Sequence, residues 1–141
     1  MKTKLIIGIA SSLLFVGCAS ALNSGMYSNS DSTLKVETRT VNYLTDNNDM
    51  ALYTFDKDTN NKSNCYNGCE TKWPVFYTDI NKLNLPMGIK TADFGTIKRD
   101  NGAMQTTYKS KPLYYFFKDS KAKDTNGDWA KGVWHLVELN K

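Results

Sequence analysis

The chain has 141 residues, of which 40% are hydrophobic, and its formal net charge is +4. This length suits one domain with a core of modest size. So mild a charge, without a concentrated basic patch, excludes a nucleic-acid partner, because tracking a phosphate backbone requires one.

The first residues have the form of a bacterial export signal. Lys2 and Lys4 precede the apolar run Leu5–Val16, whose twelve residues are too few to span a bilayer as a helix. The run leads into Phe-Val-Gly-Cys, which resembles a lipobox. We therefore predict that residues 1–17 are a lipoprotein signal peptide and that Cys18 is lipidated. A plain secretory signal with an incidental cysteine is the alternative.

The segment after the lipobox is rich in Ser, Asn and Gly. We expect residues 18–34 to comprise the lipidated Cys18 and a flexible tether that reaches on the order of 20 Å. The expected location is the cell envelope, with the membrane as a partner through the lipid anchor. The residue after Cys18 is not Asp, which favours the outer membrane if the envelope is Gram-negative. Residues 35–141 are predicted to form a single β-rich domain.

The first half of this domain is predicted to begin with a hairpin. Residues 35–44 are rich in β-branched side chains and predict a strand, residues 46–49 predict a polar turn, and residues 50–55 predict a second strand. A short helix is expected over residues 65–72, stopped by Pro74. A buried strand over residues 75–77 follows.

The second half repeats this arrangement. Residues 94–99 and 103–108 predict two strands around Asp-Asn-Gly, where Asn101 and Gly102 indicate a two-residue hairpin turn. Further strands are expected over residues 113–117 and 133–139. The predicted fold class is therefore all-β or β-dominated, with at most one or two short helices.

An internal duplication relates the two halves. The stretch Leu-Tyr-Thr-Phe-Asp-Lys-Asp at residues 52–58 returns as Leu-Tyr-Tyr-Phe-Phe-Lys-Asp at residues 113–119, and the same offset of 61 positions carries Trp73 onto Trp134. The repeat extends over about residues 41–77 and 102–138. It predicts two pseudo-repeated antiparallel hairpin units that share one core.

Both copies contain the pattern Tyr-x-aromatic-x-x-Asp. With the segment Cys65-x3-Cys69-x3-Trp-Pro, this pattern resembles the bacterial secreted-repeat lipoproteins named for a Yx(FWY)xxD motif. The resemblance implies a lipoprotein or secreted repeat, and it implies no established activity. The motif residues are Tyr53, Phe55, Asp58, Tyr114, Phe116 and Asp119.

The repeated Tyr and Phe lie two positions apart, so in a strand they face the same side. We expect that side to be the core, and an aromatic groove for a ligand such as a glycan or quinone is the alternative. Asp58 and Asp119 are expected to cap loops through side-chain to backbone hydrogen bonds.

Cys65 and Cys69 form an even pair in an exported protein, which predicts a disulfide. A sharper alternative joins both cysteines to His135, the only histidine, because two thiolates and an imidazole suit copper. That alternative would make the protein a periplasm-facing copper-binding or redox accessory protein.

The sequence does not indicate an enzyme. It has no Gly-x-Ser-x-Gly and no glycine-rich phosphate loop. We therefore expect no catalytic residues and, unless the copper alternative holds, no cofactor. The predicted function is a lipid-anchored binding or structural module whose partner is an unknown envelope protein or small ligand.

Overall fold

The computed structural model describes residues 34–38 and 42–139. The predicted signal peptide, Cys18 and nearly all of the tether therefore lie outside the described residues. Within the described ranges, none of the helices has the length and apolar character needed to cross a membrane.

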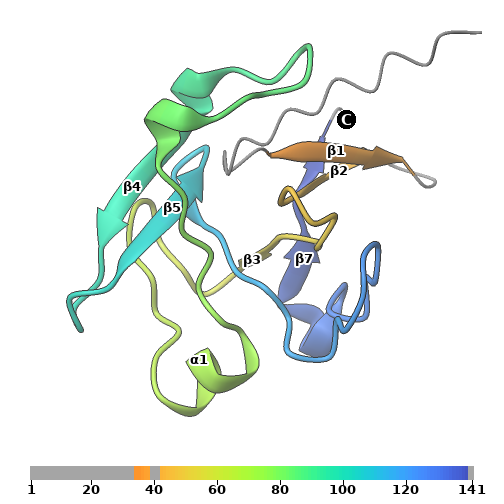
Figure 1. Ribbon diagram of the computed structural model, residues 1–141. Coiled ribbons are helices and arrows are strands. Elements are labelled where there is room, and N and C mark those ends of the chain that lie inside the picture. The colour runs from red at the N-terminus through yellow and green to blue at the C-terminus, as the bar shows by residue number, and fades with distance from the viewer. Residues whose placement is uncertain (1–33, 39–41, 140–141) are drawn as a thin grey trace, which may run out of the picture.

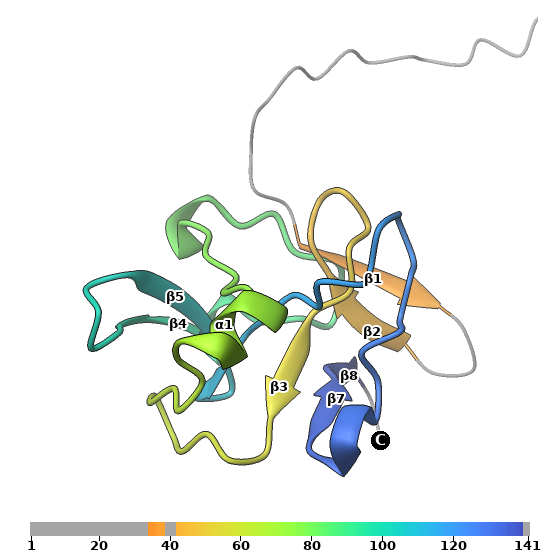
Figure 2. The same ribbon diagram turned by 90° about the horizontal axis from the view of Figure 1, so that it is seen from below.

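Short antiparallel strands dominate the fold, as the sequence predicts. One sheet has the order β1 (Lys35–Thr38), β2 (Asn42–Thr45) and β8 (Glu138–Leu139). A second pairs β3 (Tyr53–Phe55) with β7 (Trp134–Leu136). The third has the order β4 (Phe94–Lys98), β5 (Met104–Tyr108) and β6 (Lys111–Pro112). The β4–β5 hairpin and the β1–β2 pair lie on opposite sides of β3 (Figures 1 and 2).

Helical structure is limited to short pieces. The described residues contain one α-helix, α1 (Gly68–Lys72), which Figure 1 shows at the end of the molecule away from β1. Single 3₁₀ turns form η1 (Ile80–Lys82), η2 (Thr91–Asp93) and η3 (Ala130–Gly132). The expectation of a β-dominated domain with at most one or two short helices is confirmed.

The two repeats meet at their tyrosines. The Tyr53 backbone N–H donates to the Tyr114 carbonyl at 2.9 Å, and the Tyr114 N–H donates back to Tyr53 at 3.0 Å. On its other edge, Tyr53 pairs with Leu136 and Tyr114 with Val75, which are again equivalent positions. Equivalent residues thus contact one another across an approximate twofold axis. Each repeat completes the other's strand pairing, so the halves form one unit.

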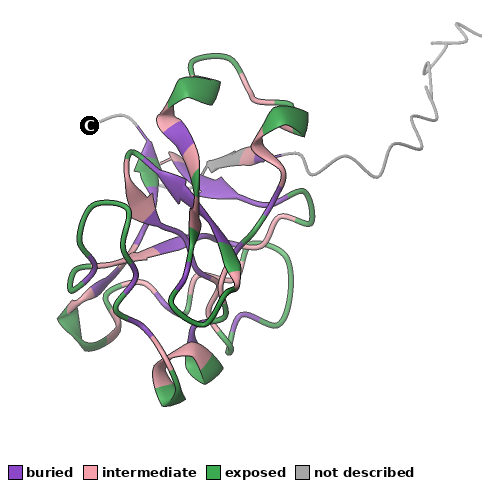
Figure 3. Cartoon of the chain, turned by 90° about the vertical axis from the view of Figure 1, so that its left-hand side faces the viewer, coloured by how far each residue is buried: buried purple, intermediate pink, exposed green. Residues whose placement is uncertain are grey.

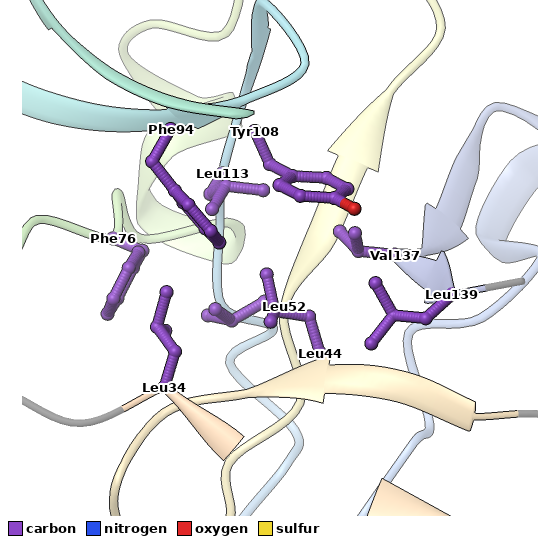
Figure 4. Packing of buried hydrophobic residues seen from close by; sticks show 9 residues of the cluster. All are labelled: Leu34, Leu44, Leu52, Phe76, Phe94, Tyr108, Leu113, Val137 and Leu139. Carbon is purple, nitrogen blue, oxygen red and sulfur yellow. The ribbon is translucent and has the colours of Figure 1, made fainter. Parts of the chain in front are cut away.

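Buried side chains form two clusters, and each draws on both repeats. The first contains mostly aliphatic residues, and Figure 4 shows Leu52 and Leu113, which are equivalent in the duplication, among them. The second is aromatic and centres on Trp73 and Trp134, whose rings stack with centroids 3.7 Å apart and planes at 3°. Exposed residues lie mainly in loops and on the short helices (Figure 3). Burial of these duplicated apolar residues is the main source of stability.

Several predicted elements differ from the structure. The strands expected over residues 75–77 and 113–117 are absent, because these segments pair only through isolated bridges at Val75 and Tyr114, and Tyr77 is exposed. Residues 35–44 are not one strand, because β1 and β2 pair with each other, from Lys35 opposite Thr45 to Thr38 opposite Asn42. The segment thereby satisfies its own backbone hydrogen bonds, and β2 uses its second edge for β8. The predicted helix over residues 65–72 is shorter, since α1 begins only at Gly68.

The hairpin between β4 and β5 exists, but its predicted two-residue turn is wrong. The Gly102 N–H donates to the Arg99 carbonyl at 2.9 Å, and only Gly102, with φ 85°, is left-handed there. The Asn101 side chain instead accepts a hydrogen bond from the Ala103 N–H at 3.2 Å. A four-residue turn whose last residue is a left-handed glycine is the usual geometry of a longer hairpin loop.

Candidate functional site

The repeated tyrosines and aspartates bond across the repeats. The Tyr53 hydroxyl donates to Asp119 at 2.6 Å, and the Tyr114 hydroxyl donates to Asp58 at 2.7 Å. Both tyrosine side chains are fully buried. We call these two contacts the cross-repeat pairs. Each joins the aspartate of one repeat to the tyrosine of the other, so the motif holds the two halves together.

The same aspartates also cap their own loops. Asp58 accepts the backbone N–H of Asn64 at 2.7 Å, and Asp119 accepts that of Asn126 at 2.9 Å. One carboxylate oxygen thus fixes the local loop, and the other reaches the opposite repeat. This arrangement explains why tyrosine and aspartate occur together in each copy.

Burial governs the ionisation of these groups. It raises the pKa of Tyr53 well above the usual 10.0, and the Asp119 carboxylate raises that pKa further. Burial also raises the pKa of Tyr114, although the hydrogen bond with Ser63 lowers it. The pKa of Asp58 is raised by burial, against the hydrogen bond from the Asn64 N–H. Both phenols therefore stay protonated through the neutral range and act as donors.

Cys65 and Cys69 form a disulfide, with Cα atoms 5.2 Å apart. The Cys65 carbonyl accepts a hydrogen bond from the buried guanidinium of Arg99, which comes from the turn between β4 and β5. The same guanidinium contacts Glu70 at 3.0 Å and lies 4.4 Å from the Tyr66 ring centroid. The disulfide loop thus forms part of a cage around a buried cation.

His135 contacts other groups. Its Nε2 atom lies 2.9 Å from an Asp56 carboxylate oxygen, and its ring meets the Trp129 indole edge-to-face at 4.7 Å. Among the residues that the structure describes, no group of three or more His, Cys, Asp or Glu side chains could hold a metal ion. The structure therefore does not bring Cys65, Cys69 and His135 together as the ligand set of the copper alternative.

A surface groove of about 460 Å³ lies beside this histidine. Its lining comes from β3, from the end of β5 with the following turn and β6, from β7 and β8, and from the loop before η3. We call it the Trp129 groove. Among the residues that line it are Thr54, Lys109, Lys111, Trp129, His135 and Glu138.

Trp129 is the most unusual residue in this groove. Its side chain is 70% exposed, and its φ of 59° is left-handed, a conformation that costs a non-glycine residue about 1–2 kcal/mol. Lys109, which also lines the groove, is left-handed as well, with φ 46°. Exposed aromatic surface and backbone strain both oppose folding. Among the described residues, six further non-glycine residues outside the groove lining are also left-handed, so the exposed indole is what distinguishes this position.

The duplication distinguishes the residues of this groove from the residues that maintain the fold in both repeats. The offset of 61 positions carries Trp129 onto Gly68, His135 onto Pro74 and Asp56 onto Phe117. The three residues in contact here therefore have no chemical counterpart in the other half. Tyr53, Asp58 and their equivalents maintain the fold in both halves, whereas this cluster occurs once. Sequence reasoning missed Trp129, although its unmatched position in the duplication was a usable signal.

Comparison with known proteins identifies the repeated unit. The model of the Lipoprotein_15 family, described as a secreted repeat of unknown function, matches residues 42–77 and 95–138. Searches of curated proteins and of solved structures return no significant match. Each matched segment contains one Tyr-x-aromatic-x-x-Asp pattern, and the two segments meet at Tyr53 and Tyr114. The match covers more than half of the sequence, so the chain belongs to this family of secreted repeats.

Proposed function

We propose that the protein is a lipid-anchored binding module of the cell envelope and that its ligand occupies the Trp129 groove. One observation carries this proposal. Trp129 is 70% exposed in a left-handed backbone conformation and packs edge-to-face on His135, which Asp56 in turn holds. An indole that buries little of itself and strains its backbone contributes little to folding, and ligand binding accounts for it.

The anchor in this proposal is Cys18, at the end of the lipobox-like Phe-Val-Gly-Cys. Lipidation there would hold the domain at a membrane surface, which is the outer membrane if the envelope is Gram-negative. Residues 19–33 would then let the groove reach ligands near that surface.

The proposal contains no catalytic step. The groove lining includes the Thr54 hydroxyl, and the proposal assigns it to ligand contact rather than to nucleophilic attack. The imidazole is occupied by Asp56 and Trp129, so its role here is to position the indole. Binding, without chemical conversion, is what this arrangement supports.

The anchor is tested by labelling growing cells with radioactive palmitate. Wild-type protein should incorporate label and sediment with membranes, whereas Cys18→Ser should remain unlabelled. Labelling of the Cys18→Ser variant would contradict the assigned anchor.

Binding is tested with the chain from residue 18 carrying Cys18→Ser, which retains every described residue. This protein should sediment with isolated cell envelopes, and Trp129→Ala should weaken the association roughly tenfold, equivalent to about 1.4 kcal/mol. Phe117→Ala is the matched control, because Phe117 is an exposed aromatic outside the groove and lines a different depression. Equal loss in both variants, or loss only in Phe117→Ala, would contradict the proposed site.

A further inference from the structure

The Trp129 indole offers a flat apolar surface to solvent. His135 meets it with ring planes at 85°, and the side chain remains 70% exposed. A pyranose ring presents a matching surface, because the C–H bonds on one face of the sugar form an apolar patch while its hydroxyls point outward. Aromatic residues with one apolar and one wet side suit such amphipathic ligands.

The polar groups around the indole suit hydroxyls. Thr54 contributes a hydroxyl, Lys109 and Lys111 contribute ammonium donors, and Asp128 and Glu138 contribute carboxylate acceptors. A sugar hydroxyl both donates and accepts, so it can use either kind of group. A lining that mixes donors and acceptors therefore matches a polyhydroxylated ligand.

The charges of the lining point to a ligand without net charge. The lining contains two lysines and two carboxylates, so the formal charges balance apart from the His135–Asp56 pair. A groove built for a polyanion would carry an excess of positive charge, and one for a polycation an excess of negative charge. Electrostatic complementarity therefore favours a neutral ligand.

The groove is also held in shape before any ligand arrives. The Ala130 N–H donates to the Gly127 carbonyl at 3.1 Å, and the Gly132 N–H donates to Trp129 at 3.0 Å, so the tryptophan lies within tight turns. The volume of the Trp129 groove, about 460 Å³, falls in the range of about 300–1,000 Å³ typical of small-ligand sites. A preorganised site loses less conformational entropy on binding.

We infer that the ligand is a neutral glycan, with one pyranose ring stacked on Trp129 and its hydroxyls bonded to the lysines and carboxylates of the groove. This inference rests on the proposed function, which requires only that some envelope component binds there. It adds the chemical class of that component and makes binding weakly dependent on salt, because no net charge is neutralised.

Tryptophan fluorescence gives a direct readout. Of the three tryptophans, Trp73 and Trp134 are buried and only Trp129 is exposed, so quenching by acrylamide reports mainly on the groove. The chain from residue 18 with Cys18→Ser would be titrated with cellotetraose, maltotetraose and tetra-N-acetylchitotetraose as neutral probes. Tetragalacturonate is the polyanionic control.

At least one neutral tetrasaccharide should protect Trp129 from quenching at low and at high salt. Calorimetry should show roughly tenfold weaker binding of that sugar by Trp129→Ala, about 1.4 kcal/mol, and unchanged binding by Phe117→Ala. The inference is overturned if no neutral probe binds, if tetragalacturonate binds more tightly, or if Trp129→Ala binds as the wild type does. Should envelope binding still depend on Trp129 in that event, the proposed function stands. If that dependence is also missing, both fail.

Discussion

Removing the Tyr53 hydroxyl should reveal what the repeated motif contributes to stability. This hydroxyl is fully buried, donates to Asp119 at 2.6 Å and accepts the Gly127 N–H at 3.3 Å. Tyr53→Phe keeps the ring, which packs edge-to-face on Trp73 with centroids 5.5 Å apart. The substitution therefore deletes one cross-repeat pair and leaves the aromatic packing in place.

The expected cost follows from what remains unpaired. Asp119 keeps its contacts with Asn126 through one oxygen but loses the donor to the other. A hydrogen bond to a charged group contributes about 1.5–3 kcal/mol, so we expect the free energy of unfolding to fall by about 2–3 kcal/mol. For a domain of this size each kcal/mol corresponds to about 4–8 °C in Tm.

Urea unfolding followed by circular dichroism measures this loss. A double-mutant cycle with Asp119→Asn should return a coupling energy of about 1–2 kcal/mol, because the two side chains contact each other directly. Tyr77→Phe is the control, since Tyr77 is 53% exposed, and it should change stability by less than about 0.5 kcal/mol. A Tyr53→Phe effect as small as that of the control would refute the view that the motif joins the repeats.

Three further outcomes are expected. Gly127→Ala should cost about 1–3 kcal/mol in urea unfolding, because an added Cβ would lie 2.9 Å from the Tyr53 ring; an unchanged midpoint would contradict this packing. Above pH 10 the free energy of unfolding should fall by about 4.1 kcal/mol per pH unit, since the folded state raises the pKa values of Tyr53, Tyr114 and Tyr115 and keeps three protons that the unfolded chain releases. Replacing Tyr53 and Tyr114 by phenylalanine should reduce that slope to about 1.4 kcal/mol per pH unit, the contribution of Tyr115. Intact mass should show that Cys65 and Cys69 resist alkylation in protein purified from the envelope. Replacing both by serine should lower the free energy of unfolding by about 2 kcal/mol. Free thiols would reopen the copper alternative.

The duplication made much of the fold and of its shared core predictable. Leu52, Tyr53 and their equivalents recur with strand periodicity and apolar character, which sufficed to expect a shared core. The partners of the motif residues were not predictable. Tyr53 and Asp58 lie close in sequence, but the structure bonds Tyr53 to Asp119, 66 residues away. Choosing between these partners requires knowing which strands pair, and periodicity does not contain that information.

The pairing of β1 with β2 was not predicted because the sequence between them lacks the residues that usually form turns. The sequence between β1 and β2 reads Arg-Thr-Val and includes no glycine, proline, asparagine or aspartate, so it did not indicate that residues 35–44 divide into two strands. The cage around Arg99 was missed for a related reason. Its acceptors come from Ser63, Cys65, Glu70 and Gln105, and only the tertiary fold brings these residues together.

The sequence did not predict the Trp129 groove, because the left-handed backbone conformation of Trp129 cannot be read from its residue type. A tryptophan is ordinarily expected to be largely buried, and nothing in the sequence around Trp129 indicated otherwise. Its left-handed φ of 59° instead places it at the surface, beside the unmatched pair His135 and Asp56. Under the proposed function, the positions at which the two halves differ are therefore a better guide to the ligand site than those at which they agree.

Trp129→Gly is the most direct test of the central claim. That claim is that residues without an equivalent in the other repeat bind the ligand, whereas residues repeated in both halves stabilise the fold. Glycine accepts the left-handed conformation without strain, which offsets the lost edge-to-face contact with His135 of about 0.5–1.5 kcal/mol. We predict that the free energy of unfolding stays within about 1 kcal/mol of the wild type or rises. Sedimentation with isolated cell envelopes, measured on the same preparation, should weaken roughly tenfold. A variant that unfolds more easily yet binds envelopes normally would contradict the account.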